Sequence, residues 1–107
     1  MLDEKTILDL KSKHGEDLAS IDCPDGTQLV FRKPNRMEYE RWFDKRTDQP
    51  TKSARELCAT THVWPEGAFQ AAYERWPAIL TSVGGMLDAV TILAGMAAGE
   101  ATQPKKL

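Results

Sequence analysis

The feature that most constrains the fold is a tight turn between two stretches with the composition of β-strands. Residues 23–27 read Cys-Pro-Asp-Gly-Thr, in which the proline presets one backbone angle and the glycine accepts a positive φ. They separate residues 18–22 from residues 28–33, where Leu29 and Phe31 lie on one side of the strand. A β-hairpin alone is only marginally stable in water, so helices must cover one of its faces. The turn therefore predicts an α+β fold.

The rest of the chain has the spacing of amphipathic helices, punctuated by prolines and glycines. Asn35 is placed to cap one helix, with Glu38 at the capping-box position. The predicted helices cover residues 4–14, 35–46, 52–64, 66–76 and 78–98. We therefore expect a mainly helical α+β fold: a short N-terminal helix, the β-hairpin, then about four helices ending in an apolar C-terminal helix. Residues 1–98 are expected to form a single domain, and residues 99–107 a polar C-terminal tail.

Aromatic side chains supply much of the predicted core. On the second helix Tyr39, Trp42 and Phe43 share a stripe, so Trp42 and Phe43 are expected to face the hairpin. Arg41 and Lys45 are expected on the opposite, solvated side. The next two helices carry similar stripes, made of Ala54, Leu57, Cys58, Thr61 and Trp64, and of Phe69, Ala72, Tyr73 and Trp76. Aromatic residues at helical spacing belong to a core more often than to a platform that stacks nucleic-acid bases.

Residues 78–98 are unusual because Asp88 is the only charged residue among them. One face of the predicted helix is apolar and is expected to be core: Ile79, Val83, Met86, Leu87, Val90, Leu93, Ala94 and Ala97. A transmembrane span is an alternative, since the length is sufficient. Against it, alanine and glycine contribute little to insertion, and an aspartate at the midpoint would cost about 3 kcal/mol.

A helix with so little charge is expected to be buried on two sides, whereas a monomer needs only one buried stripe. The second, weaker face carries small or apolar residues that would let another backbone approach. The candidate protein-binding residues on this face are Gly84, Gly85, Ile92, Gly95 and Met96. We therefore expect this face to mediate self-association, the binding of a partner helix, or both in turn.

Nothing in the sequence predicts an enzyme. It lacks Gly-x-Ser-x-Gly, His-Glu-x-x-His and a glycine-rich phosphate loop after a strand. Cys58 and His62 have metal-ligand spacing, but no second such pair exists and Cys58 lies on a core stripe. We therefore predict no catalytic residue, no metal site and no cofactor. The two cysteines and the polar, acidic opening predict a cytoplasmic protein without a disulfide framework or a signal peptide.

Charge is distributed unevenly, although the formal net charge is only −2. Residues 1–31 hold three basic and seven acidic side chains, whereas residues 32–55 hold eight basic and four acidic ones. The basic segment is best interpreted as a solvated helix face of mixed charge, with a nucleic-acid-binding face as the alternative. Because acidic neighbours offset this charge, we predict only weak binding to duplex DNA.

One segment resembles a known family. Residues 29–43, Leu-Val-Phe-Arg-Lys-Pro-Asn-Arg-Met-Glu-Tyr-Glu-Arg-Trp-Phe, are similar to a segment of the tail assembly chaperones of long-tailed bacteriophages. In that family a short hairpin ends in phenylalanine, a basic pair, proline, an arginine and a glutamate-tyrosine pair, and then leads into a helix. The order that follows is also similar: a helix ending in Val-Trp-Pro at residues 63–65, a short helix ending in Trp-Pro at residues 76–77, and a small-residue apolar helix.

The resemblance, which covers residues 5–98, implies a cytoplasmic helper of virion assembly, located in the host cell cytoplasm if a phage encodes it. Proteins of this family coat the long helical tape measure protein, keep it soluble, and then give way to tail tube subunits. The implied partners are the tape measure protein, with the tail tube protein as a second candidate, and further copies of the chain. The alternatives are a structural subunit retained in the mature virion tail and a small regulatory protein that binds nucleic acid.

Overall fold

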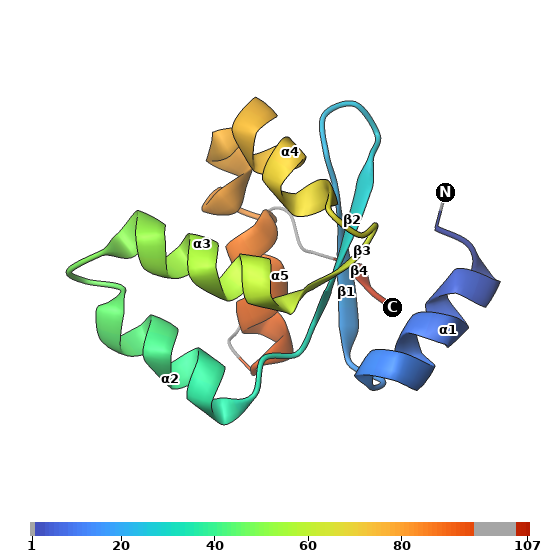
Figure 1. Ribbon diagram of the computed structural model, residues 1–107, viewed down its shortest axis with the longest axis horizontal. Coiled ribbons are helices and arrows are strands. Elements are labelled where there is room, and N and C mark those ends of the chain that lie inside the picture. Colours follow the sequence, from blue (N-terminus) through green and yellow to red (C-terminus); the bar gives the residue numbers. More distant parts are fainter. Residues whose placement is uncertain (1, 96–104) are drawn as a thin grey trace.

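The computed structural model describes residues 2–95 and 105–107 (Figure 1). It contains an antiparallel sheet in the order β3-β2-β1-β4. The strands are β1 (Leu18–Asp22), β2 (Gln28–Arg32), β3 (His62–Trp64) and β4 (Lys105–Lys106). The helices are α1 (Glu4–His14), α2 (Arg36–Lys45), α3 (Pro50–Thr61), α4 (Ala68–Arg75) and α5 (Met86–Leu93), with a 3-10 helix η1 (Pro77–Leu80) before α5. The predicted mainly helical α+β fold is confirmed.

The predicted hairpin forms with the expected turn. Cys23 donates its backbone N–H to the Thr27 carbonyl at 2.7 Å, and Gly26 adopts a φ of 89°. A carboxylate oxygen of Asp25 accepts the backbone N–H of Thr27 at 2.9 Å, which fixes the turn locally. Strand β2 ends at Arg32, one residue earlier than predicted. The turn chemistry thus sets the register of β1 against β2.

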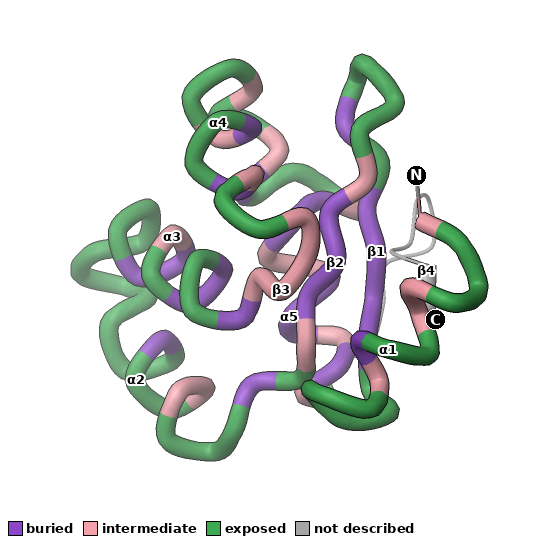
Figure 2. Tube along the Cα trace, turned by 45° about the vertical axis from the view of Figure 1, so that its right-hand side comes forward, coloured by how far each residue is buried: buried purple, intermediate pink, exposed green. Residues whose placement is uncertain are grey.

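The two faces of the sheet bury separate sets of residues. Helices α2 to α5 lie on one side of the sheet and α1 lies on the other (Figure 1). The strands β1 and β2 are buried along most of their length, while the outer sides of the helices are exposed (Figure 2). The main core joins the sheet to α2–α5 through Ala19, Ile21, Leu29, Phe31, Trp42, Ala54, Leu57, Cys58, Phe69, Ala72, Leu80, Met86, Ala89, Val90 and Leu93. Because side chains alternate along a strand, the other face of the sheet needs its own cover.

Helix α1 and the end of the chain provide that cover. Leu10 of α1 packs with Leu18 and Val30 from the opposite sheet face. Leu107 is half-buried beside them, and its backbone N–H donates to the Leu18 carbonyl at 3.0 Å. Residues 105–107, which were predicted to belong to a polar tail, therefore lie against β1, where pairing satisfies backbone groups on the side of β1 that β2 does not cover. Residues 99–104 of the predicted tail lie outside the described part of the chain.

The predicted helix over residues 52–64 is wrong at both ends. Helix α3 begins at Pro50, since proline is well suited to the first helical turn, and it ends at Thr61. The three residues after it form β3, in which Trp64 pairs with Val30 of β2. A residue that precedes proline avoids the helical region, so Pro65 favours an extended Trp64. The predicted helix 66–76 is shorter than expected and corresponds to α4.

The continuous helix predicted over residues 78–98 is also wrong. The chain forms η1, turns through residues 81–85, and only then begins α5. At the turn Gly84 adopts a φ of 76°, and its backbone N–H donates to a carboxylate oxygen of Asp88 at 2.8 Å. The break divides the predicted apolar face: Met86 is fully buried, whereas Val83 is 63% exposed. Leu87, predicted to be core, is only half-buried.

The predicted aromatic stripe of α2 is confirmed for Trp42 and wrong for Phe43. Trp42 is 7% exposed and belongs to the main core, whereas Phe43 is 42% exposed. Phe43 stacks on Tyr39, and the guanidinium of Arg46 lies 3.5 Å from the centre of the Phe43 ring. Adjacent residues of a helix point in directions about 100° apart, so Phe43 cannot face the sheet when Trp42 does.

Candidate protein-binding surface

The residues predicted to bind a partner do not share one helix face. Gly84 and Gly85 lie in the turn before α5, Ile92 is half-buried near the end of α5, and Gly95 follows that helix. Met96 lies outside the described residues. The predicted surface required an unbroken helix, so the turn at residues 81–85 removes its geometrical basis.

Two of these glycines have local backbone roles. A Cβ on Gly85 would collide with the Ile79 carbonyl oxygen and would lie 2.9 Å from the Ser82 carbonyl oxygen. Gly95 adopts a φ of 108°, which a residue with a side chain rarely adopts, and its N–H donates to the Ile92 carbonyl at 3.0 Å as the helix ends. The requirement for glycine at these positions is therefore explained by a turn and a helix terminus.

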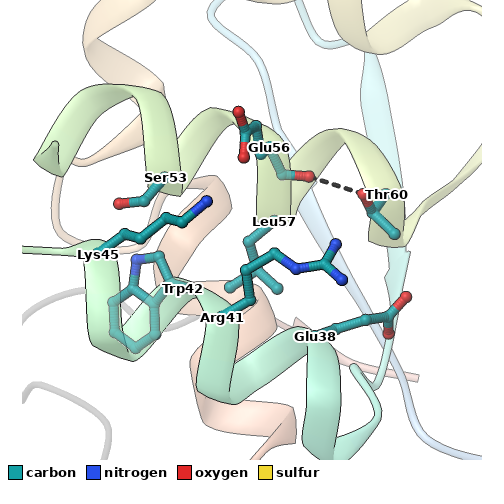
Figure 3. A pocket seen from close by; sticks show the side chains of 8 residues that line it. All are labelled: Glu38, Arg41, Trp42, Lys45, Ser53, Glu56, Leu57 and Thr60. Carbon is teal, nitrogen blue, oxygen red and sulfur yellow. Dashed lines mark hydrogen bonds between the residues drawn. The ribbon is translucent and has the colours of Figure 1, made fainter.

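A cleft between α2 and α3 is the better candidate. The two helices pack side by side at the edge of the molecule farthest from α1 (Figure 1). The cleft has a volume of about 70 Å³, enough for a few water molecules or one short side chain. Figure 3 shows the residues that line it: Glu38, Arg41, Trp42, Lys45, Ser53, Glu56, Leu57 and Thr60.

The floor of the cleft is apolar and belongs to the core. Trp42 of α2 and Leu57 of α3 are 7% and 4% exposed, respectively. The hydroxyl of buried Ser53 donates to the Pro50 carbonyl at 3.3 Å, and the hydroxyl of Thr60 donates to the Glu56 carbonyl at 2.8 Å. Because both hydroxyl protons are used within α3, the donors still available to a ligand come from α2.

One end of the cleft is fixed by an ion pair. Nη1 and Nη2 of Arg32 each donate to one carboxylate oxygen of Glu38 at 2.9 Å. Nη2 also donates to the Thr60 carbonyl oxygen at 3.3 Å. The Asn35 side chain accepts the Glu38 backbone N–H at 2.8 Å, and Glu38 accepts the Asn35 backbone N–H at 2.9 Å. This joint holds β2, α2 and α3 in fixed relation.

The same contacts keep Glu38 ionised. The hydrogen bond from Arg32 is the largest influence and lowers the pKa of the Glu38 carboxyl, and the Asn35 backbone N–H and the positive charges of Arg32 and Arg41 act in the same direction. Partial burial acts the other way but does not prevail. Glu38 is thus a structural carboxylate whose oxygens are already engaged.

Two cations at the mouth are not engaged. Arg41 and Lys45 form no ion pair with any of the residues that the structure describes. Their side chains extend along the mouth above Trp42 and Leu57 (Figure 3). Both residues are exposed, which confirms the prediction that they lie on the solvated side of α2, and α3 packs beside them. Residues four apart lie on the same face of a helix, so the sequence places Arg41 and Lys45 together beside Trp42. It does not reveal that α3 packs there and forms the second wall of the cleft.

Neither cysteine is arranged as a reactive thiol. Burial raises the pKa of Cys58, which lies in the main core, and burial together with Asp25 and Asp22 raises the pKa of Cys23. Within residues 2–95 and 105–107, no group of three or more His, Cys, Asp or Glu side chains is placed to hold a metal ion.

His62 lies close to an aromatic part of the core. Its ring meets Phe31 edge-on, with centroids 5.5 Å apart. Among the described residues, His62 Nε2 is the only buried side-chain nitrogen or oxygen that lacks a hydrogen-bond partner. Burial lowers the pKa of this imidazole. The neutral ring is therefore the form that this site accommodates.

Comparison with known proteins finds no matching family model, no matching curated protein and no matching solved structure. In the part of the chain that the structure describes, no helix combines the length and the apolar character needed to cross a membrane.

Proposed function

We propose that this protein is a tail assembly chaperone of the type found in long-tailed bacteriophages, which binds the hydrophobic helical tape measure protein and keeps it soluble during tail morphogenesis. The observation that carries the proposal is the α2–α3 pair, whose cleft gives a partner access to an apolar floor between two helices. An amphipathic helix can be recognised by a cleft of this kind when one of its side chains reaches the floor and its apolar stripe packs against the rim.

The segment that resembles the phage family supports the proposal. Its phenylalanine, Phe31, is fully buried in the core. Its Arg32, Asn35 and Glu38 form the joint that sets α2 against β2 and α3. The residues that carry the resemblance thus build the helix pair that contains the cleft, so the family pattern and the candidate surface concern the same part of the fold.

Additional apolar side chains are available for weak contacts. Leu8, Met37 and Val83 are 62%, 67% and 63% exposed. Scattered exposed apolar residues are common on any protein surface, so we assign the specificity to the cleft and only supplementary contact area to these residues. A surface of this type suits a helper that must release its client, because transient interfaces are small and partly polar.

Self-association is part of the proposal, with the half-buried Ile92 as its candidate contact. Ile92→Glu is expected to reduce the assembled mass measured by light scattering while leaving the far-ultraviolet circular dichroism unchanged. Met86→Glu is the matched core variant, since Met86 is fully buried and a charge there should unfold the protein. If Ile92→Glu unfolds the protein as Met86→Glu does, the residue is core and not a contact.

The test of function is co-expression with the candidate tape measure protein, a long helical protein that this proposal expects to be encoded next to the chain. We expect that protein to remain in the soluble fraction with the chaperone and to precipitate without it. Mass spectrometry of purified virions distinguishes a chaperone from a structural tail subunit. A chaperone is absent from mature particles, whereas a tail subunit is present in many copies. Failure to increase the client's solubility, with the chaperone itself folded and soluble, would refute the proposal.

A further inference from the structure

We propose that the α2–α3 cleft receives an acidic side chain from a helical segment of the partner, held by Arg41 and Lys45 beside the ring of Trp42. This inference rests on the proposed function and specifies the chemistry of the client. The occupant is an amphipathic helix with a glutamate or aspartate next to its apolar stripe, and the argument for it is the charge and hydrogen-bonding character of the cleft.

Three hydrogen-bond donors lie at the cleft. Arg41 and Lys45 contribute their cationic groups, and Trp42 contributes its indole N–H. The indole nitrogen lies beside Lys45 at the cleft, and its N–H forms no hydrogen bond with any of the described residues. These three groups only donate hydrogen bonds. The complementary ligand is a group whose oxygens only accept hydrogen bonds, such as a carboxylate.

The acidic residues of the cleft do not cancel these cations. Both oxygens of Glu38 are held by Arg32, so that pair contributes no net charge. Glu56 stands on the α3 side of the mouth and forms no ion pair with any described residue. With one positive charge each on Arg41 and Lys45 and one negative charge on Glu56, the open part of the cleft carries a net charge of +1. An anionic guest is favoured there, and a cationic one is not.

The size and floor of the cleft restrict the guest further. A volume of about 70 Å³ admits one short side chain and excludes a whole helix. The methylene groups of a glutamate can lie on Trp42 and Leu57 while its carboxylate stays at the mouth. The remaining apolar residues of the partner helix would contact the rim. Recognition therefore requires an acidic residue adjacent to an apolar stripe, rather than an apolar helix alone.

The test uses two synthetic helical peptides with the same leucine and alanine stripe, one with glutamate beside the stripe and one with glutamine. Fluorescence anisotropy gives the Kd of each labelled peptide for the full chain at low salt. We expect the glutamate peptide to bind roughly fivefold more tightly, the effect of a partly exposed charge pair. The Arg41→Gln/Lys45→Gln double variant is expected to lose the preference for the glutamate peptide.

Two further variants serve as controls. Lys52→Gln removes one positive charge from an exposed lysine of α3 that does not line the cleft, and it should retain the fivefold preference. Trp42→Phe keeps an aromatic ring in the floor and removes the N–H, so it should lower the preference for glutamate more than the affinity for the glutamine peptide. Circular dichroism confirms that each variant is folded.

The inference is overturned if the double variant retains the preference, or if the wild-type chain shows no preference or no binding at millimolar peptide. It is also overturned if inorganic phosphate or a single-stranded oligonucleotide displaces the glutamate peptide at equal concentration, because the cleft would then be a general anion site. The proposed function fails separately. Solubilisation of the client that persists in the double variant leaves the chaperone proposal standing and removes only the role of the cleft.

Discussion

Replacing Gly85 by alanine tests the turn that interrupts the predicted C-terminal helix. The predicted continuous helix and the observed turn imply effects of opposite sign on the free energy of unfolding. In the middle of a continuous helix, glycine to alanine stabilises by about 1 kcal/mol, because alanine has the higher helix propensity. In the observed turn the new methyl group would collide with the Ile79 carbonyl oxygen and crowd the carbonyl and hydroxyl oxygens of Ser82 at 2.9 Å.

The size of the effect follows from what those atoms can do. The Ser82 carbonyl accepts the N–H of Gly85 at 2.9 Å, so moving it away breaks a hydrogen bond that the turn requires. Ile79 lies within η1, next to the fully buried Leu80, so its carbonyl cannot shift without disturbing the core. Overpacking of a closely packed site costs about 1–3 kcal/mol, and backbone atoms place this case in the upper half of the range.

Urea denaturation followed by tryptophan fluorescence measures the effect. A loss of about 2 kcal/mol lowers the midpoint by roughly 1 M at the slope typical of a small domain. Thr81→Ala, at an exposed position of the same segment, is the control and should change stability by no more than about 0.5 kcal/mol. A midpoint that rises or stays constant in Gly85→Ala would refute the turn and restore the continuous helix.

Three other predictions concern stability. Trp42→Ala should cost about 3–5 kcal/mol because the ring is buried, whereas Phe43→Ala should cost about 1 kcal/mol or less because that ring is 42% exposed; equal losses in denaturation would contradict this difference. Since the Arg32 contact lowers the pKa of Glu38, the pair contributes stability that is present above the ordinary carboxyl pKa of about 4.5 and is lost as the pH falls through the lower folded value. Glu38→Gln should therefore lower the free energy of unfolding by about 1–2 kcal/mol at pH 7 and flatten its pH dependence between pH 5 and 3. Urea titrations at each pH measure both effects. Since burial lowers the pKa of His62, the unfolded chain takes up the proton first, so stability should fall as the pH drops below about 6.5; a slope between pH 7 and 5.5 that persists in His62→Gln would assign the effect to another group.

Local chemistry made the hairpin and the start of α2 predictable. The Pro-Asp-Gly turn and the capping box each depend on residues within four positions of one another, so their geometry follows from the sequence alone. The break before α5 was missed for the opposite reason. Apolar residues keep a helical period across Gly84 and Gly85, and the turn depends on contacts with η1 and on the side chain of Asp88.

Strand β3 and the cleft depend on tertiary structure and were not predictable in the same way. Three residues are too few for alternation to identify a strand, and the pairing of Trp64 with Val30 joins positions far apart in the chain. The periodicity of α2 separated a buried side from a charged side. It could not show that α3 would pack beside Arg41 and Lys45 and convert two solvated cations into the mouth of a cleft.

The central claim is that this protein keeps an apolar helical client in solution. The most direct measurement is light scattering from a purified helical segment of the candidate tape measure protein, diluted from denaturant into buffer with increasing amounts of the chain. We predict that scattering falls progressively and is abolished near a stoichiometric ratio, and that the Arg41→Gln/Lys45→Gln variant needs several times more protein. Scattering that is unaffected by an excess of the folded wild-type chain would contradict the account.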